Sequence, residues 1–570
     1  MPLRLIDVGS ESQAPRLFER PPRDSTGRRA PYACLSYCWG LKPGEEVLKT
    51  TTENCDVHKA EIPIKSAPPA IQDAVDLCRG LGIKYLWVDS LCLTQDNLQM
   101  WLSEAAEMDS IYLNSHLTIA ALEPHTCKLH FLGPQPFGTP DWQYFMQTDT
   151  VCDDGQTVDM VIRPEGSNPA KVAATKTTSL DTRAWCFQES LLPNRRLCFD
   201  GNEMIWECLC TKICECGHAI RRPPTLRYSV LGAGMKEKML KGVPLQSGPK
   251  PFVYQHEERD FDLGNMNINA KWRRLISDYS SRHMTVPKDR LRAVSGLAKV
   301  VLDWFRKDRK TTSAPVEYLA GLWKHELQLD LAWVVTEFRP KPSVREGETP
   351  WNVPTWSWAS AWGGVMFPGA MTPKWKYTAR IRNMCRVEKV DCEKEYQKDE
   401  TSAVTEGRAK LYGTLVAVKP SREADLGNSR EAETFWFGDA GKDPDQARER
   451  KWFVRAENGE ENGEEVAVMF DEPLSLPSES QSTDHPKKGL PTNDRYYCFR
   501  LFAWLADDTR VYRGDGGEIT MGPETWFLLL RSSQRVQGAM ERVGIGKHES
   551  KDGIPCPIFK DAKDEIVEIV

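Results

Sequence analysis

The sequence predicts an α/β fold for the N-terminal part of the chain, followed by a helical region and a β-rich C-terminal region. Three observations lead to this prediction. Short apolar runs alternate with helix-like segments between residues 32 and 122, amphipathic patterns dominate residues 226–345, and strand-like runs return after residue 346. Strands that alternate with helices are typical of β-α-β units, which form parallel sheets with right-handed crossovers.

Length and composition bound the class of protein. A chain of 570 residues is too long for a single core. Apolar residues make up 40%, charged residues 27% and the net charge is −6, so no basic face for nucleic acid or anionic membranes is indicated. No stretch is typical of a signal peptide or a membrane span, and we expect a cytoplasmic protein. The 17 cysteines are expected to be mostly buried thiols rather than a disulfide framework.

Local patterns place the first elements. In order, we expect a strand at 3–8, a polar loop to about residue 30, strand 32–40, a helix, strand 85–88, helix 98–114 and strand 116–122. The first helix should begin at Pro68 and Pro69 and stop at Gly82, because proline favours helix starts and glycine favours helix ends. Residues 32–122 are therefore predicted to form a β-α-β-α-β unit.

The loop that leaves strand 85–88 is the most site-like place in the chain, because ligands bind at the carboxyl ends of parallel strands. In the helix that follows, one apolar stripe is predicted from Trp101, Ala105, Met108 and Tyr112. Glu104 falls about 80° from the middle of this stripe and Glu107 about 140° from it. Glu107 should face water, and Glu104 should lie on the border, where a carboxylate can line a cleft. Both can equally be ordinary surface carboxylates.

The rest of the chain divides into regions of different character. We expect an irregular insertion at 123–178, then helical and strand-like segments to about residue 209. Three amphipathic helices are predicted between 226 and 345, the last of them in EYLAGLWKHELQLDLAW. Strands are predicted after residue 346, interrupted near 421–492 by a charged stretch of loops and disorder. The predicted domains are 1–225, 226–345 and 346–570.

Three blocks in this order resemble the fungal HET (heterokaryon incompatibility) domain. The first is YACLSYCWG, with Tyr37, Trp39 and Gly40; the second is YLWVDSLCLTQD with Trp101, Glu104 and the following IYLN and LTIAA; the third is RAWCFQE, with Arg183, Trp185, Gln188 and Glu189. The family often has Thr-Leu where this chain has Cys186 and Phe187. Together the blocks span about residues 32–199.

The resemblance implies a role in non-self recognition and regulated cell death, with no required cofactor. The family also looks distantly similar to TIR domains, which are flavodoxin-like modules of innate immunity, some of which cleave NAD with a helix-borne glutamate. The spacing of Trp101 and Glu104 is similar to that around the TIR glutamate. Glu104 would then hold the ribose of NAD and stabilise an oxocarbenium-like transition state. Asp89, Ser90, Gln95 and Trp101 would line the cleft.

Other interpretations stay open for the same residues. Asp89 and Ser90 are good capping residues, Gln95 can simply tie down its loop, and Arg183 can form an ion pair with Glu189. The domain can also act without catalysis, by self-association or by binding a sensor partner.

A metal site is the third possibility. Dense cysteines in WECLCTKICECGH could bind zinc through Cys208, Cys210, Cys214 and Cys216, with His218 nearby, although the spacing is not that of a zinc knuckle. Motifs of dehydrogenases, P-loop NTPases and HExxH metalloproteases are absent from the sequence.

Overall fold

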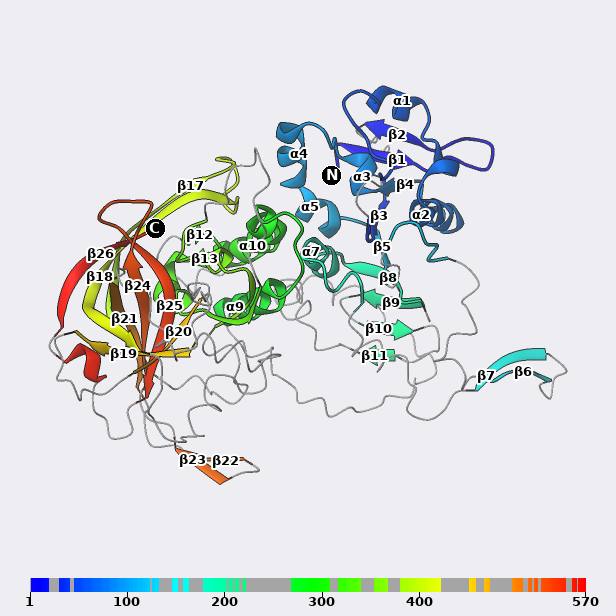
Figure 1. The fold of residues 1–570 in the computed structure, drawn as a ribbon. Helices are drawn as coiled ribbons and strands as arrows, with labels where there is room; N and C mark the ends of the chain where they lie inside the picture. Colours follow the sequence, from blue (N-terminus) through cyan, green and yellow to red (C-terminus); the bar gives the residue numbers. More distant parts are fainter. Residues whose placement is uncertain are drawn as a thin grey trace, which may run out of the picture. The chain divides into compact units, whose positions relative to one another are not determined.

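The computed structural model describes the chain in segments. The described residues are 2–19, 30–40, 46–122, 126–132, 146–151, 157–162, 178–201, 204–208, 211–214, 219–221, 268–307, 316–339, 353–367, 380–421, 451–457, 466–471, 495–505, 511–514, 517–520, 524–549, 556–560 and 562–570. The chain divides into two compact units, Met1–Asp260 and Phe261–Val570, coloured blue to teal and green to red in Figure 1. The predicted boundaries at residues 225 and 345 stay predictions.

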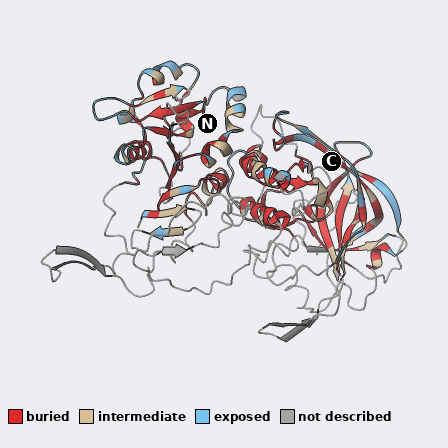
Figure 2. Ribbon diagram, turned by 180° about the vertical axis from the view of Figure 1, so that it is seen from behind, coloured by how far each residue is buried: buried red, intermediate tan, exposed pale blue. Residues whose placement is uncertain are grey.

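The first unit is built on a mixed sheet, for which the described residues supply nine strands in the order β11-β10-β9-β8-β5-β3-β4-β1-β2. The strands are β1 (Arg4–Asp7), β2 (Arg16–Glu19), β3 (Tyr32–Ser36), β4 (Tyr85–Trp87), β5 (Leu117–Ala121), β8 (Arg195–Phe199), β9 (Met204–Cys208), β10 (Thr211–Cys214) and β11 (Ala219–Arg221). Neighbours among β4, β3, β5 and β8 run parallel. The predicted parallel sheet is therefore confirmed at the centre, where the strands are buried (Figure 2), and is wrong for the antiparallel flanks.

The helices of this unit connect the parallel strands. They are α1 (Cys55–Ala60), α2 (Pro69–Gly80), α3 (Asp89–Cys92), α4 (Leu98–Ala105), α5 (Met108–Leu113) and α7 (Trp185–Leu191). Helix α2 begins and ends as predicted, with proline at its first turn and Gly82 at φ +69° beyond its end. The loop predicted before residue 30 contains the edge strand β2, which pairs with β1 because Leu17 is buried opposite Ile6. A hairpin of β6 (Met146–Val151) and β7 (Thr157–Ile162) lies in the predicted insertion.

The single helix predicted for 98–114 is wrong, because the structure breaks it into α4 and α5. At the break the Glu107 N–H donates to the Glu104 carbonyl, three residues back, instead of continuing the α-helical pattern. Helix α5 then directs Met108 and Tyr112 into the core, where the Tyr112 hydroxyl donates to the Leu35 carbonyl. Glu107 is exposed, as predicted.

The second unit begins with the predicted helices α9 (Ile268–Ser280) and α10 (Asp289–Lys307). The third predicted helix is wrong over most of its length. Its first half forms a tight hairpin of β12 (Tyr318–Leu319) and β13 (Leu322–Trp323), followed by the short helix α11 (Leu327–Asp330). Ala320 and Gly321 both have positive φ, which is the geometry of a two-residue hairpin turn.

The C-terminal region forms an antiparallel sheet whose pairings close into a ring, in the order β18-β21-β24-β25-β20-β19 and back to β18. Its strands are β16 (Arg380–Asn383), β17 (Cys385–Lys394), β18 (Val404–Ser421), β19 (Lys451–Ala456), β20 (Val466–Phe470), β21 (Tyr496–Leu505), β24 (Glu524–Ser532), β25 (Met540–Glu549) and β26 (Lys563–Ile569). The predicted β-rich character is confirmed. Strands β19 and β20 lie within the charged stretch at 421–492, most of which is outside the described residues.

The connection between β17 and β18 is attached to α10 by ion pairs. Cations spaced seven residues apart along one side of α10 face acidic side chains of this connection. The pairs are Arg292–Glu395, Lys299–Asp399 and Arg306–Glu400. They hold the hairpin against the helix within the second unit.

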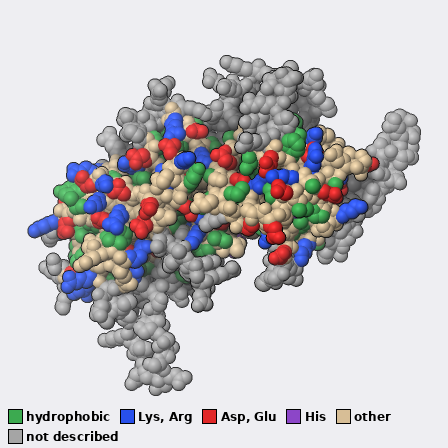
Figure 3. Space-filling view, turned by 90° about the horizontal axis from the view of Figure 1, so that it is seen from above, with side chains coloured by type: hydrophobic (Ala, Val, Ile, Leu, Met, Phe, Trp, Pro, Cys, Tyr) green, Lys and Arg blue, Asp and Glu red, His purple; other side chains and the backbone are tan. Residues whose placement is uncertain are grey.

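The surface of the described residues carries interspersed charges on the face shown in Figure 3, with acidic and basic side chains side by side. Among the helices described, none combines the length and the apolar character that crossing a membrane requires.

Candidate functional site

The sequence-predicted residues gather mainly at the carboxyl ends of β3 and β4. The chain leaves β3 toward β4 on one side and later returns to β5 on the other, so the strand order reverses at β3. Such a reversal opens a crevice at the carboxyl ends, where ligands bind in open α/β sheets. Side chains from the end of β3 and the loop after it, from α3, and from α7 with the residues just before it form what we call the strand-end cluster. Its members are Ser36, Tyr37, Trp39, Asp89, Ser90, Arg183, Gln188 and Glu189.

Hydrogen bonds join the ends of β3 and β4. The Tyr37 hydroxyl donates to Ser90 Oγ at 3.0 Å, and Trp39 Nε1 donates to Asp89 Oδ2 at 3.2 Å. Asp89 Oδ1 accepts the backbone N–H of Ser90 at 2.7 Å, but Asp89 is the first residue of α3 and Val88 is its N-cap, so this contact is not a helix cap. Burial raises the pKa of Asp89, against the opposing effects of these donors and of Arg183.

Glu189 is the most perturbed carboxyl group of the cluster. It lies on α7, is 7% exposed, and its Oε2 accepts the Ser36 hydroxyl at 2.5 Å. Burial raises the pKa of Glu189 to about 7, with a further increase from the nearby Asp89. Buried carboxyl groups with a pKa near neutrality are suited to acid–base work and are concentrated at functional sites.

Arg183 lies close enough to influence the carboxyl groups of both Asp89 and Glu189. Its positive charge acts on Asp89 and on Glu189, and its guanidinium also hydrogen-bonds the Cys38 side chain. Among the described residues Arg183 forms no ion pair with Glu189 within 4.0 Å, and its charge lowers the pKa of Glu189 and of Asp89 alike. One guanidinium beside two carboxyl groups leaves the cluster with a surplus of negative charge when both are ionised.

The remaining predicted residues of this region support the loops. Gln95 Nε2 donates to the Asp89 and Leu93 carbonyls at 3.0 and 3.3 Å, so Gln95 ties down its loop. The rings of Trp101 and Trp185 meet edge to face with centroids 6.0 Å apart. Gly40 is exposed and has φ +54°, a conformation that favours glycine at the turn after β3.

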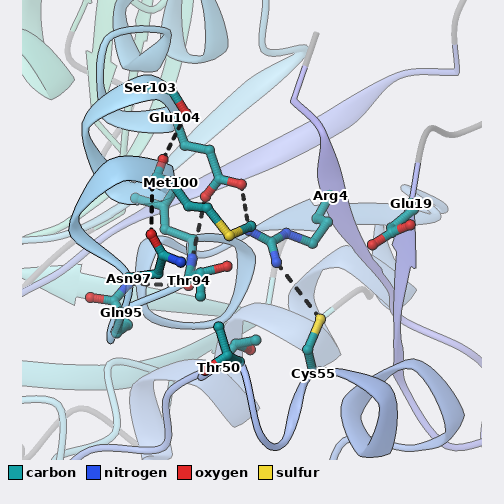
Figure 4. A network of polar contacts seen from close by, with 12 residues as sticks. Arg4, Glu19, Thr50, Cys55, Thr94, Gln95, Asn97, Met100, Ser103 and Glu104 are labelled. Carbon is teal, nitrogen blue, oxygen red and sulfur yellow. Dashed lines mark hydrogen bonds and ion pairs between the residues drawn. The ribbon is translucent and has the colours of Figure 1, made fainter.

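Glu104 lies in a different polar network, shown in Figure 4. Its Oε1 accepts Arg4 Nη2 at 2.5 Å and its Oε2 accepts the Thr94 backbone N–H at 3.3 Å. The Arg4 guanidinium is 2% exposed and also reaches Cys55 Sγ at 3.7 Å. Burial raises the pKa of Glu104, while Arg4 acts in the opposite direction. Both carboxylate oxygens are thus engaged by protein groups, one of which belongs to the loop that also carries Gln95.

The predicted zinc site is only partly visible. Cys208 lies half-buried at the end of β9 as a free thiol, and Cys214 ends β10. Cys210, Cys216 and His218 are outside the described residues. No group of potential metal ligands is found within the described segments, and the expectation that the chain requires no zinc at these cysteines stays untested.

Residues 32–189 match the protein family described as "Heterokaryon incompatibility protein (HET)". This match supports a heterokaryon incompatibility domain protein. The matched HET segment begins at β3 and ends at Glu189, so the whole strand-end cluster lies inside it, whereas Arg4 lies outside. No curated protein and no solved structure matches the chain.

Sequence reasoning missed two partners of the predicted residues. Ser36 ends a wholly buried strand, and a lone hydroxyl in that position is a signal that it has a buried partner. Arg4 is the other, and its partner Glu104 is 100 positions away, which no local pattern indicates. Glu189 was predicted as a motif residue, but its perturbed acidity depends on the packing of α7 against β3.

Proposed function

We propose that this chain is an effector of heterokaryon incompatibility, acting in fungal non-self recognition and regulated cell death. The observation that carries this proposal is the match of residues 32–189 to the HET family. The proposal places the effector activity in the first unit and leaves regulation to the second unit or to a sensor partner.

The chemistry we propose is TIR-like cleavage of NAD. In chain order the parallel strands β4, β3, β5 and β8 are second, first, third and fourth, which is the order of flavodoxin-like sheets. This order supports the flavodoxin/TIR-like interpretation of the domain. In the reaction a carboxylate holds the ribose and stabilises positive charge at its anomeric carbon as nicotinamide leaves. The spacing from Trp101 nominates Glu104 for this role.

A second candidate is assembly without catalysis, in which the domain self-associates or binds a sensor protein. One observation favours it. Glu104 is engaged by the buried Arg4 and by a backbone N–H, as expected of a carboxylate that stabilises the fold. In this alternative the cell-death signal would come from association of the chain, and NAD would be untouched.

Expression of the full chain in a yeast host separates the two candidates, with cellular NAD and viability followed over the same time course. Cleavage predicts that NAD falls before viability does. Death with NAD intact would rule out cleavage and leave assembly. The variant Glu104→Gln tests the nominated residue, and Glu107→Gln, an exposed carboxylate three positions away, is the matched control.

A further inference from the structure

Among the described residues of the first unit, carboxyl groups with a raised pKa lie in two places, the Glu104 network and the strand-end cluster. The two places differ in the partners that these carboxyl groups have. Glu104 has its charge matched by the buried Arg4 at 2.5 Å. Glu189 and Asp89 share the charge of Arg183, and the hydrogen bonds to the Glu189 carboxyl group come from the neutral hydroxyl groups of Ser36 and Tyr112. A carboxylate without a cation of its own keeps more of its acceptor capacity for the hydroxyl groups of a ligand. The strand-end cluster meets this condition better than the Glu104 network.

Burial within the strand-end cluster is graded from the outside inward. Asp89, Trp39 and Arg183 are half-buried, whereas Glu189 is 7% and Gln188 2% exposed. Among the described residues, none donates to or accepts from the Gln188 side-chain amide. A ligand that carries hydroxyl groups would donate to the carboxyl groups of Glu189 and Asp89.

We propose that the strand-end cluster is the nucleotide site of the first unit, and that Glu189 is the carboxylate that contacts the ribose hydroxyls. This inference rests on the proposed cleavage of NAD and names the place where the substrate lies. Asp89 and Arg183 stand at the entrance to the site, and Ser36 is a positioning residue that fixes one oxygen of Glu189. In this assignment Glu189 takes the role for which the spacing from Trp101 nominates Glu104, and the Glu104–Arg4 pair stabilises the fold.

The reaction balances with water as the co-reactant. The bond between the ribose anomeric carbon and the nicotinamide nitrogen breaks, and its electron pair goes to the ring nitrogen, which loses its positive charge. The oxygen of a water molecule bonds to the anomeric carbon. The Glu189 carboxylate takes the proton that this water releases and passes it to solvent. The products are ADP-ribose, nicotinamide and one proton.

Binding of ADP-ribose to the purified full chain, measured by calorimetry, tests the site without relying on turnover. Loss of a charge-assisted hydrogen bond predicts that Glu189→Gln binds about tenfold to a hundredfold more weakly. Asp89→Asn should also weaken binding, whereas Glu107→Gln, on the exposed surface, should stay within about twofold of the wild type. Circular dichroism of each variant establishes that it is folded.

The pH dependence of binding gives a second readout. Hydroxyl donors prefer the ionised carboxylate, so wild-type affinity should rise from about pH 6 to about pH 8, while Glu189→Gln should show a flatter profile. Asp89 also has a raised pKa, so the pH profile of Asp89→Asn shows how much of the pH dependence of binding comes from Asp89. The titratable and charged groups that face Glu189 are Cys34, Cys38, Asp89, Tyr112 and Arg183.

Two results overturn the site assignment. One is ADP-ribose binding that survives Glu189→Gln and disappears in Glu104→Gln, and the other is no ADP-ribose binding by the wild type. The experiments distinguish an incorrect assignment of the nucleotide site from an incorrect proposal of NAD cleavage. NAD loss in cells together with binding unaffected by Glu189→Gln would reject the site and keep the function. Binding that depends on Glu189, with cellular NAD intact, would keep the site and reject the cleavage.

Discussion

Replacing Glu189 with glutamine is expected to stabilise the protein above neutral pH. The folded-state pKa of about 7 lies above the ordinary value of 4.5 because the carboxyl group is buried. The folded protein therefore binds the proton more tightly than the unfolded chain, and wild-type stability falls as the pH rises between these two values. The difference of about 2.5 corresponds to about 3 kcal/mol, at 1.36 kcal/mol for each pKa unit. Glutamine resembles the neutral carboxyl group and does not titrate.

Urea unfolding of the full chain at a series of pH values measures this effect, and hydrogen exchange in β3 and β5 assigns it to the first unit. At about pH 5 the two proteins should have similar stability, and at about pH 8 Glu189→Gln should be the more stable by about 3 kcal/mol. Glu107→Gln, on the exposed surface, should show no such divergence. A gap between Glu189→Gln and the wild type that stays constant with pH would refute the reasoning.

Two further predictions concern stability alone. Glu104→Ala should lower the free energy of unfolding by about 3 kcal/mol, because a buried guanidinium loses its counter-charge; the exposed Glu107→Ala should cost less than about 0.5 kcal/mol. Equal losses in urea unfolding would contradict a structural ion pair. Gly321→Ala should cost more than about 3 kcal/mol, because the backbone has φ +96° and the new Cβ would lie 2.3 Å from Trp358 Nε1. Gly538→Ala, at φ +80° in open space, should cost about 1 kcal/mol, and similar losses in the two variants on thermal unfolding would show that Trp358 yields without cost.

The order of elements in residues 32–122 could be predicted because strand and helix periodicities are local properties. The break between α4 and α5 could not, since the sequence there has neither glycine nor proline. It arises where α5 turns Met108 and Tyr112 into the core. The hairpin at 318–323 was missed for a related reason, because its turn contains Ala320, a residue that rarely adopts positive φ.

The sequence could predict those residues of the site that directly follow a strand. Tyr37, Asp89 and Ser90 follow strands, and parallel strands bring their carboxyl ends to one edge. The raised pKa values of Asp89 and Glu189 could not be predicted, because the burial that raises them exists only in the packed protein. Glu104 and Glu189 both lie in segments that the sequence predicts as helical, and only the packed structure shows that Glu104 is paired with Arg4 whereas Glu189 is hydrogen-bonded by the hydroxyl groups of Ser36 and Tyr112.

The ion pairs between α10 and the β17–β18 connection become more exposed along the helix. Arg292 and Glu395 are 15% and 25% exposed, whereas Arg306 and Glu400 are 52% and 61% exposed. Salt screens exposed pairs most effectively, so the attachment weakens first at its outer end. Rising salt should therefore separate the hairpin from α10 gradually, starting at the Arg306–Glu400 end, while the closed ring of strands stays folded. The attachment of this hairpin thus depends on the ionic strength of the solution.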